Sequence, residues 1–226
     1  MEELKNRLYL SFVFQDRWKL FLEGLGITLL LTVGSFVLGS FFGAAFCALK
    51  TSRHGFVRKA TNAFISLLVQ VPTLVLLMLF VYIFFGDTSL SVTIVVLLGL
   101  TLKAGAYLSE IFCTAVTAVN SGEVEAAHTL GLSRVQVFLH ITLPQAISSA
   151  LPVYKNQFVI TLQETSVVGY LAVMDLTRAS EVVTARTYDA LFGLVIVSVL
   201  YLLIGYLGNL LLNLLGKKKH LGGDGK

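Results

Sequence analysis

Three stretches of this sequence run for more than twenty residues without one charged side chain: 27–49, 60–86 and 190–216. A helix rises 1.5 Å per residue, so about 20 apolar residues cross the hydrocarbon core of a bilayer. Only 13% of the residues are charged, against about 25% in a typical soluble domain. The mean hydropathy of +0.82 agrees. The chain is therefore expected to span a membrane.

Two further apolar stretches are interrupted by charge: 90–119 contains Lys103 and Glu110, and 146–174 contains Lys155 and Glu164. We therefore predict a single all-α, polytopic unit over residues 1–226 with about five transmembrane helices, near 20–49, 60–86, 90–119, 146–174 and 190–216. Residues 1–19 mix charges with Leu4, Leu8 and Phe12 at helical spacing, which predicts an interfacial helix. A frayed tail is the alternative.

Basic residues gather in three segments that an even number of spans separates: 50–59, 120–145 and 217–219. The positive-inside rule makes these segments cytoplasmic. The N-terminus is then expected outside the membrane and the C-terminus in the cytoplasm. Topology and anionic membrane lipid explain the net charge of +4, so no nucleic-acid partner is expected.

Motifs for catalysis are missing from the sequence. It contains no G-x-x-x-x-G-K-[ST] phosphate loop, so we expect no ATP hydrolysis by this chain. No catalytic triad, paired carboxylates or metal-ligand spacing stands out, so no catalytic residue, bound metal or cofactor is expected. The two cysteines, Cys47 and Cys113, fall inside predicted spans and are interpreted as small packing residues rather than a disulfide.

The segment 120–145 is too polar for a span but has helix signals. Ser121 is a candidate N-cap, Gly131 a stop, and Ser133 a second N-cap for a short helix over 134–139. Pro144 suits the first turn of the next span. Two short helices joined at a glycine are predicted. They could rest on the membrane surface or dock a cytoplasmic partner, and the residues alone favour neither.

This loop resembles a known family. Glu125-Ala126-Ala127, then Gly131, then Leu143-Pro144, has the spacing of the "EAA" loop in permeases of binding-protein-dependent ABC importers. The resemblance implies a coupling helix that contacts the ATP-hydrolysing subunit through Glu125, Ala126, Ala127 and Gly131. Further segments resemble the polar amino acid branch of the family (histidine, glutamine or arginine type): 23–29, 70–74, 106–110, Asn156 and 163–166.

The resemblance implies the permease subunit of an ATP-driven importer that carries a polar amino acid inward across a bacterial or archaeal cell membrane. Its implied partners are a cytoplasmic ATP-binding subunit dimer that uses ATP and Mg, an extracytoplasmic solute-binding protein, and a second permease copy or a homologous permease. The rival interpretations are a stand-alone secondary transporter or channel and an intramembrane enzyme.

Polar side chains form stripes on two predicted spans. Lys103, Tyr107 and Glu110 share a face of the third, and Gln157, Thr161 and Glu164 share a face of the fourth. A charge at mid-bilayer needs a partner or a cavity. Glu110 or Glu164 could take the ammonium of an amino acid, and Lys103, a hydroxyl or a helix N-terminus could take its carboxylate. Alternatively, Lys103 and Glu110 have a structural role, because they pair with each other or lie at the cytoplasmic interface. The candidate pathway residues are Lys103, Tyr107, Glu110, Asn156, Gln163, Glu164, Thr165 and Ser166.

Overall fold

The computed structural model describes residues 2, 9–84, 86 and 89–220, and the regular elements in these ranges are helical. The elements, in chain order, are η1 (Tyr9–Val13), η2 (Phe14–Asp16), α2 (Trp18–Lys50), α3 (Gly55–Gln70), α4 (Thr73–Leu79), η3 (Phe80–Phe84), α5 (Val92–Thr117), α6 (Ser121–Thr129), α7 (Arg134–Val137), η4 (Phe138–Thr142), α8 (Leu143–Glu164), η5 (Thr165–Leu171), α9 (Leu176–Thr187) and α10 (Ala190–His220).

Within the described residues, four helical stretches are long and apolar enough to cross a membrane: Phe14–Lys50, Val92–Thr117, Arg134–Leu171 and Ala190–Leu214. The bent pair α3 and α4 supplies a fifth crossing if it counts as one span. The expectation of an all-α protein with about five transmembrane helices is therefore confirmed. The second span differs from the prediction, because a sharp break divides the apolar run expected to form one helix.

Helices α2 and α5 cross in close contact because both carry glycines at the crossing. A Cβ atom added at Gly39 would lie 2.9 Å from the Cβ of Ala104, and one at Gly43 would lie 2.8 Å from the Cβ of Leu108. From the other side, a Cβ at Gly105 would lie 2.9 Å from the Cβ of Phe42. Small residues at helix crossings allow backbones to approach closely in membranes. The backbone of α2 therefore packs directly against that of α5.

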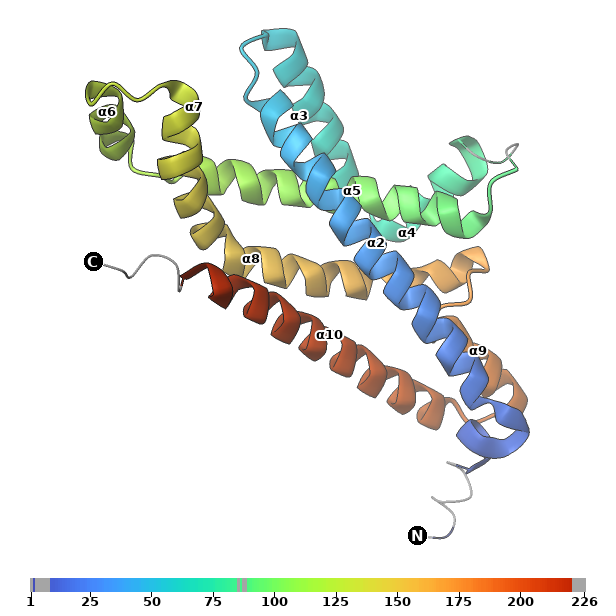
Figure 1. Cartoon of the computed structure of the whole chain (residues 1–226). Coiled ribbons are helices and arrows are strands. Elements are labelled where there is room, and N and C mark those ends of the chain that lie inside the picture. Colours follow the sequence, from blue (N-terminus) through green and yellow to red (C-terminus); the bar gives the residue numbers. More distant parts are fainter. Residues whose placement is uncertain (1, 3–8, 85, 87–88, 221–226) are drawn as a thin grey trace.

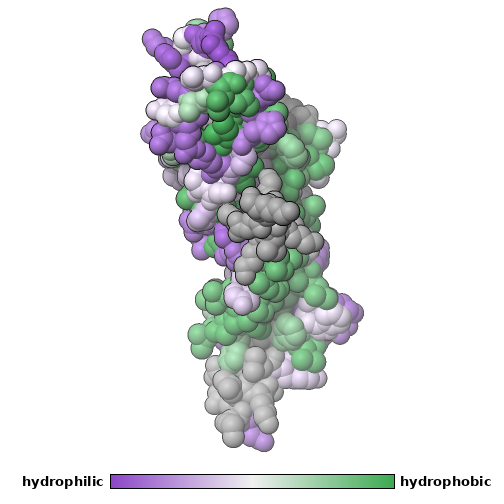
Figure 2. All heavy atoms as spheres, turned by 60° about the vertical axis from the view of Figure 1, so that its left-hand side comes forward, coloured by the Kyte–Doolittle hydropathy of each residue, from purple (hydrophilic) through white to green (hydrophobic). Residues whose placement is uncertain are grey.

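Figure 1 places α6, α7 and the last turns of α10 on the left, and α9 with the start of α2 at the lower right. The two groups of elements therefore mark opposite ends of the bundle. Hydrophilic residues gather at the upper end of the face drawn in Figure 2, while hydrophobic residues cover much of the coloured surface lower down. This distribution matches a bundle whose upper end meets water and whose apolar part lies in hydrocarbon.

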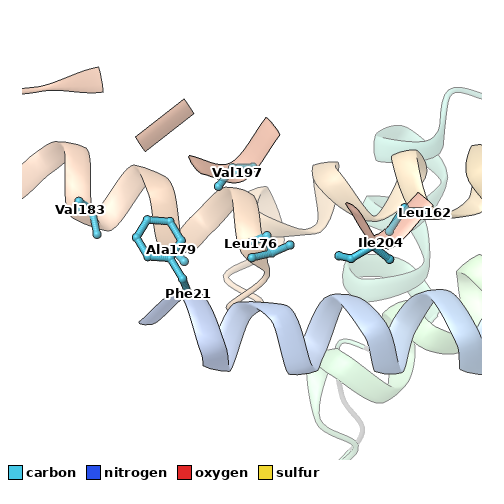
Figure 3. Packing of buried hydrophobic residues seen from close by; sticks show 7 residues of the cluster. All are labelled: Phe21, Leu162, Leu176, Ala179, Val183, Val197 and Ile204. Carbon is cyan, nitrogen blue, oxygen red and sulfur yellow. The ribbon is translucent and has the colours of Figure 1, made fainter. Parts of the chain in front are cut away.

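Helix α9 was not predicted, because it lies between the spans expected at 146–174 and 190–216. The helix begins at the N-cap Asp175, whose Oδ1 accepts a hydrogen bond of 2.8 Å from the backbone N–H of Arg178. It contributes buried apolar residues to a cluster that joins α2, α8, α9 and α10 (Figure 3): Phe21, Leu162, Leu176, Ala179, Val183, Val197 and Ile204. The cluster holds α9 on the bundle.

The N-terminal segment is not one continuous helix in its described part. Residues 9–16 form two short turns, and Gln15 and Asp16 have φ angles of 55° and 56°, in the left-handed region. These two residues interrupt the helix that the spacing of apolar residues predicted. Leu4 and Leu8, on which that prediction also depended, lie outside the described residues.

The interpretation of the cysteines was wrong. The structure joins Cys47 on α2 and Cys113 on α5 as a disulfide, with the two Cα atoms 5.5 Å apart. Disulfides usually bridge Cα atoms separated by about 4.4–6.8 Å. The two cysteines are 66 residues apart in the sequence, so no local pattern indicated that they pair. The disulfide links α2 to α5 close to the α6 end of the bundle.

Candidate functional site

The second span breaks at Val71 and Pro72. Both residues are extended, with ψ angles of 130° and 139°, and the helices on either side meet at 114°. Pro72 has no backbone N–H and disfavours a helical conformation for the residue before it. Backbone carbonyls at the end of α3 therefore lose their helical partners in the membrane interior, where side chains must replace them.

Lys103 of α5 supplies one such side chain. Its Nζ donates a hydrogen bond of 2.8 Å to the carbonyl oxygen of Val71 and lies 3.8 Å from Oε1 of Glu164, the last residue of α8. The Lys103 side chain is 3% exposed and that of Glu164 is 14% exposed. Thr73, the first residue of α4, donates a hydrogen bond of 3.0 Å to the same Glu164 oxygen. Three segments of the chain thus meet at one ion pair.

Tyr107 lies one helical turn after Lys103, and its hydroxyl donates to the carbonyl oxygen of Val69 at 3.4 Å. The predicted stripe on α5 therefore faces the broken span. Glu110, the third member of this stripe, lies elsewhere: it pairs with Lys50 at the end of α2. The alternative in which Lys103 pairs with Glu110 is wrong, because Lys103 pairs with Glu164 on α8 and Glu110 pairs with Lys50 on α2.

The remaining candidates lie around the end of α8. Asn156 and Gln163 are exposed and seven residues apart, so they share one face of the helix. Thr165 is buried, and its hydroxyl donates to the Leu162 carbonyl oxygen at 2.7 Å. The Ser166 hydroxyl donates to the Gln163 carbonyl oxygen, also at 2.7 Å. Helix α8 therefore presents a polar outer face at Asn156 and Gln163, whereas the two hydroxyls bind their own backbone.

Sequence reasoning missed the backbone partners of this site. The carbonyl oxygens of Val69 and Val71 accept hydrogen bonds from Tyr107 and Lys103, and Thr73 completes the contacts of Glu164. A valine gives no sign of a polar role. Pro72 was the available signal, because a proline inside an apolar run is expected to free carbonyl groups one turn earlier.

The loop between α5 and α8 forms an elbow, which we define as residues 120–137. Helix α6 begins at the N-cap Asn120, whose side chain accepts from the backbone N–H of Gly122 at 2.8 Å. Ser121 was the predicted cap, one residue too late. Helix α6 ends where predicted, since Gly131 has a φ angle of 85°. That left-handed conformation suits glycine because it has no Cβ atom.

The second half of the elbow begins at Ser133, as predicted. Its side chain and that of Gln136 form a reciprocal capping box. The predicted separation from the next span is wrong, because α7 continues through η4 into α8 without a gap, with Pro144 in the first turn of α8. The segment 134–171 is consequently one helical stretch of 38 residues.

The predicted contact residues of the elbow face different ways. Glu125, Ala126 and Gly131 are exposed, whereas Ala127 is 3% exposed and belongs to the inner face of α6. Large apolar side chains accompany the exposed group, since Leu130 is 82% exposed and Val135 is 66% exposed. An exposed apolar patch beside a carboxylate is typical of a protein-binding surface.

In the ranges that the structure describes, no three His, Cys, Asp or Glu side chains converge in a way that could hold a metal ion.

Related sequences resemble the chain over most of its length. It is 31% identical over 215 residues to the histidine/lysine/arginine/ornithine transport system permease protein HisM of Salmonella typhimurium, covering 86% of this chain and 90% of HisM. It is 29% identical over 219 residues to the arginine ABC transporter permease protein ArtM of Haemophilus influenzae, covering 91% and 95%.

Solved structures share the fold. A chain from the crystal structure of an amino acid ABC transporter with histidines matches with a TM-score of 0.80 and 26% identity, covering 88% of this chain and 94% of that chain. A chain of the inward-facing MetNI methionine ABC transporter matches with a TM-score of 0.71 and 18% identity, covering 88% and 97%. At 18% identity, the second likeness concerns the fold alone.

A helical bundle with a broken span, a buried polar cluster and an elbow at one end defines the membrane subunit of a transporter. The chain belongs to the family of binding-protein-dependent transport system inner membrane components, whose model matches residues 35–220. It is a multi-pass permease subunit of an ABC importer, which transports rather than catalyses.

Proposed function

We propose that this permease carries a polar amino acid inward, along a path that passes the cluster of Lys103, Thr73 and Glu164. One observation carries the proposal: among the described residues, the second carboxylate oxygen of Glu164, Oε2, is buried and accepts no hydrogen bond. An unsatisfied buried acceptor is costly and suits a cationic donor. The ammonium of an amino acid is such a donor.

The surroundings of Glu164 support the proposal. Asn156 and Gln163 present amide groups on the exposed face of α8, and Gln163 directly precedes this carboxylate along the chain. Amides on a membrane helix call for a polar lumen or a partner rather than lipid tails. We expect the remaining candidates, Thr165, Ser166 and Tyr107, to shape the path from its walls. Glu110 is left out of the path because it pairs with Lys50 at the α6 end.

The elbow is proposed as the site that docks an ATP-hydrolysing subunit, through Glu125, Ala126 and Gly131, with Ala127 supporting α6 from within. A dimer of that partner would use ATP and Mg, and this chain would hydrolyse none. An extracytoplasmic binding protein would deliver the amino acid at the other end. Either a second copy of this chain or a homologous permease would complete the path.

The orientation follows from the same proposal. The elbow and the last turns of α10 lie toward one end of the bundle, and α9 with the start of α2 toward the other (Figure 1). Placing the elbow in the cytoplasm puts Lys50, Arg53, Arg58 and Lys59 on the same side, as the positive-inside rule requires. The N-terminus would then lie outside a bacterial or archaeal cell membrane.

The test is uptake of labelled amino acids by the complete transporter in proteoliposomes, with ATP inside the vesicles and the binding protein on the other face. We expect uptake only with all components, and loss of uptake in Glu164→Gln. Uptake by the permease without its ATPase would instead identify a stand-alone transporter. Unchanged uptake and selectivity of Glu164→Gln would remove this residue from the path.

A further inference from the structure

The break in the second span leaves backbone groups without helical partners, and other parts of the chain must bind them. At Val71 and Pro72 the backbone leaves the helix, and α4 departs from α3 at 114°. A bend of this size inside hydrocarbon persists only if other groups satisfy the freed backbone and hold both halves in place. A straight helix through the same residues would satisfy more of its own backbone.

The buried side chain of Lys103 connects the two sides of the break. The Nζ of Lys103 donates to the carbonyl oxygen of Val71, on the α3 side of the break, at 2.8 Å. Through Glu164 it also reaches the α4 side, because the carboxylate oxygen that lies 3.8 Å from Nζ accepts from Thr73 at 3.0 Å. The bend is therefore bridged by a chain of contacts from Val71 through Lys103 and Glu164 to Thr73.

Tyr107 makes a weaker contribution to the same bend. Its hydroxyl reaches the Val69 carbonyl oxygen at 3.4 Å, near the upper limit for a hydrogen bond, and it carries no charge. Lys103 alone among these donors joins the broken span to α8 by an ion pair. The contact between Lys103 and Glu164 thus ties α5, the bend and the end of α8 into one unit.

We propose that Lys103 is a positioning residue for transport: its ammonium holds the second span in the bent form and ties the bend to Glu164 at the end of α8. The inference rests on the proposed function in that it gives this unit a role in the transport cycle. Lys103 acts through the backbone of the break and through Glu164, and it does not itself bind the amino acid.

The bend can be measured directly. Spin labels at Phe56→Cys and Tyr82→Cys sit at the two ends of the bent pair, where the side chains are 86% and 68% exposed. Cys47 and Cys113 are replaced by Ser in this chain, and its melting temperature in detergent is compared with that of the parent before use. Labelled permease is diluted with unlabelled permease in the complete transporter, so that each complex carries at most one labelled chain. Double electron–electron resonance then gives the distance across the bend.

We expect one narrow distance in the parent and in Lys103→Arg, which retains the charge and the donors. Lys103→Met is expected to add a longer component, because straightening separates the ends of α3 and η3. Lys155→Met is the matched control: this lysine on α8 donates to Asn213 on α10 at 2.6 Å, away from the break. It should leave the distance unchanged. A parent-like distance in Lys103→Met would overturn the proposal.

Lys103→Met leaves Glu164 without its counter-charge and could prevent folding, so a second variant is needed. Lys103→Met/Glu164→Gln removes both charges and should fold, since loss of one partner of a buried pair is the damaging change. It should still show the longer component. A single parent-like distance in this variant would also overturn the proposal.

Uptake kinetics separate positioning from binding. Lys103→Gln is expected to lower the kcat of uptake on the order of tenfold, a usual size for a coupling between sites, with little change in KM. A raised KM at unchanged kcat would make Lys103 a substrate ligand and would contradict the proposal. The distance measurement needs no amino acid, so it tests the role of Lys103 even if the complete transporter takes up no amino acid. Absence of uptake would refute only the proposed function.

Discussion

Glu110 of α5 pairs with Lys50 at the end of α2, across a gap of 60 residues in the sequence. Lys50 lies one turn after Cys47 on α2, and Glu110 lies one turn before Cys113 on α5, so the ion pair is next to the disulfide. A covalent link and an ionic link therefore follow one another along the same crossing. The first span is fastened to the third next to the point where the chain leaves α5 for the elbow.

This pair should matter little for stability and not at all for substrate binding. The side chains of Lys50 and Glu110 are 22% and 49% exposed, so solvent screens their attraction. We expect Glu110→Gln to lower the free energy of unfolding by less than about 1 kcal/mol. The KM of uptake should stay at the parent value, whereas Glu164→Gln is expected to lose uptake. A clear increase in KM for Glu110→Gln would return Glu110 to the path.

Gly24 lets α2 approach the start of α9. A Cβ atom there would lie 2.7 Å from the Asp175 carbonyl oxygen, and backbone cannot move aside cheaply. We expect Gly24→Ala to destabilise the permease by about 1–3 kcal/mol, seen as a lower melting temperature in detergent. Gly26→Ala is the matched control in the same helix, because nothing lies within 4 Å of its added Cβ. It should be neutral or slightly stabilising.

The carboxyl of Asp175, the N-cap of α9, makes the stability of the folded protein depend on pH. Burial raises the pKa of Asp175 above its usual value, and the hydrogen bonds that it accepts from Arg178 and Thr177 offset only part of this effect. A carboxyl with a raised pKa favours the folded state while protonated, so its contribution is present at low pH and declines as the pH rises through the folded pKa.

The matched variant for this effect is Asp175→Asn, which keeps an N-cap of similar strength without a titrating group. Melting temperatures measured from pH 4 to 7 should fall more steeply for the parent than for Asp175→Asn. Parallel profiles for the two proteins would show that this carboxyl does not contribute to the pH dependence.

The left-handed backbone at Gly131 predicts a graded series at the elbow. Open space surrounds the position of a Cβ atom there, so a substitution acts through the backbone and not through a clash. Gly131→Val should cost about 1–2 kcal/mol locally and reduce co-purification of the ATPase, whereas Gly131→Asn should retain it, because asparagine tolerates this conformation. Equal co-purification of both variants with the parent would mean that the angle of the elbow is unimportant for docking.

The disulfide can be tested without any partner. Mass spectrometry of the purified permease, alkylated under denaturing conditions without reductant, should show Cys47 and Cys113 unmodified and joined in one crosslinked peptide. Reduction first should make both alkylatable. Alkylation of both cysteines without reductant would instead restore the interpretation of separate packing residues.

The sequence was most informative where the signal is local. Runs of apolar residues predicted the spans, because hydropathy alone decides whether a helix can cross a bilayer. Gly131 and Ser133 predicted the turn and the second cap of the elbow for equally local reasons. The first cap was misplaced by one residue, since both Asn120 and Ser121 can cap a helix.

Relationships between distant segments could not be predicted. The pairing of Lys103 with Glu164 and of Cys47 with Cys113 depends on how the helices cross, which one sequence does not show. Helix α9 was missed for a different reason. It lies between two expected spans, although the apolar stripe of Leu176, Ala179 and Val183 has the spacing of a helix packed on one face.

The unbroken path of the chain from α7 into α8 determines how a motion of the elbow can reach the rest of the bundle. Figure 1 shows α7 at a steep angle to α8, so this helical stretch of 38 residues is bent like a bell crank. No loop separates its two arms. A push on the water-facing arm would therefore turn α8, and with it the carboxylate of Glu164, without a flexible joint to absorb the stroke.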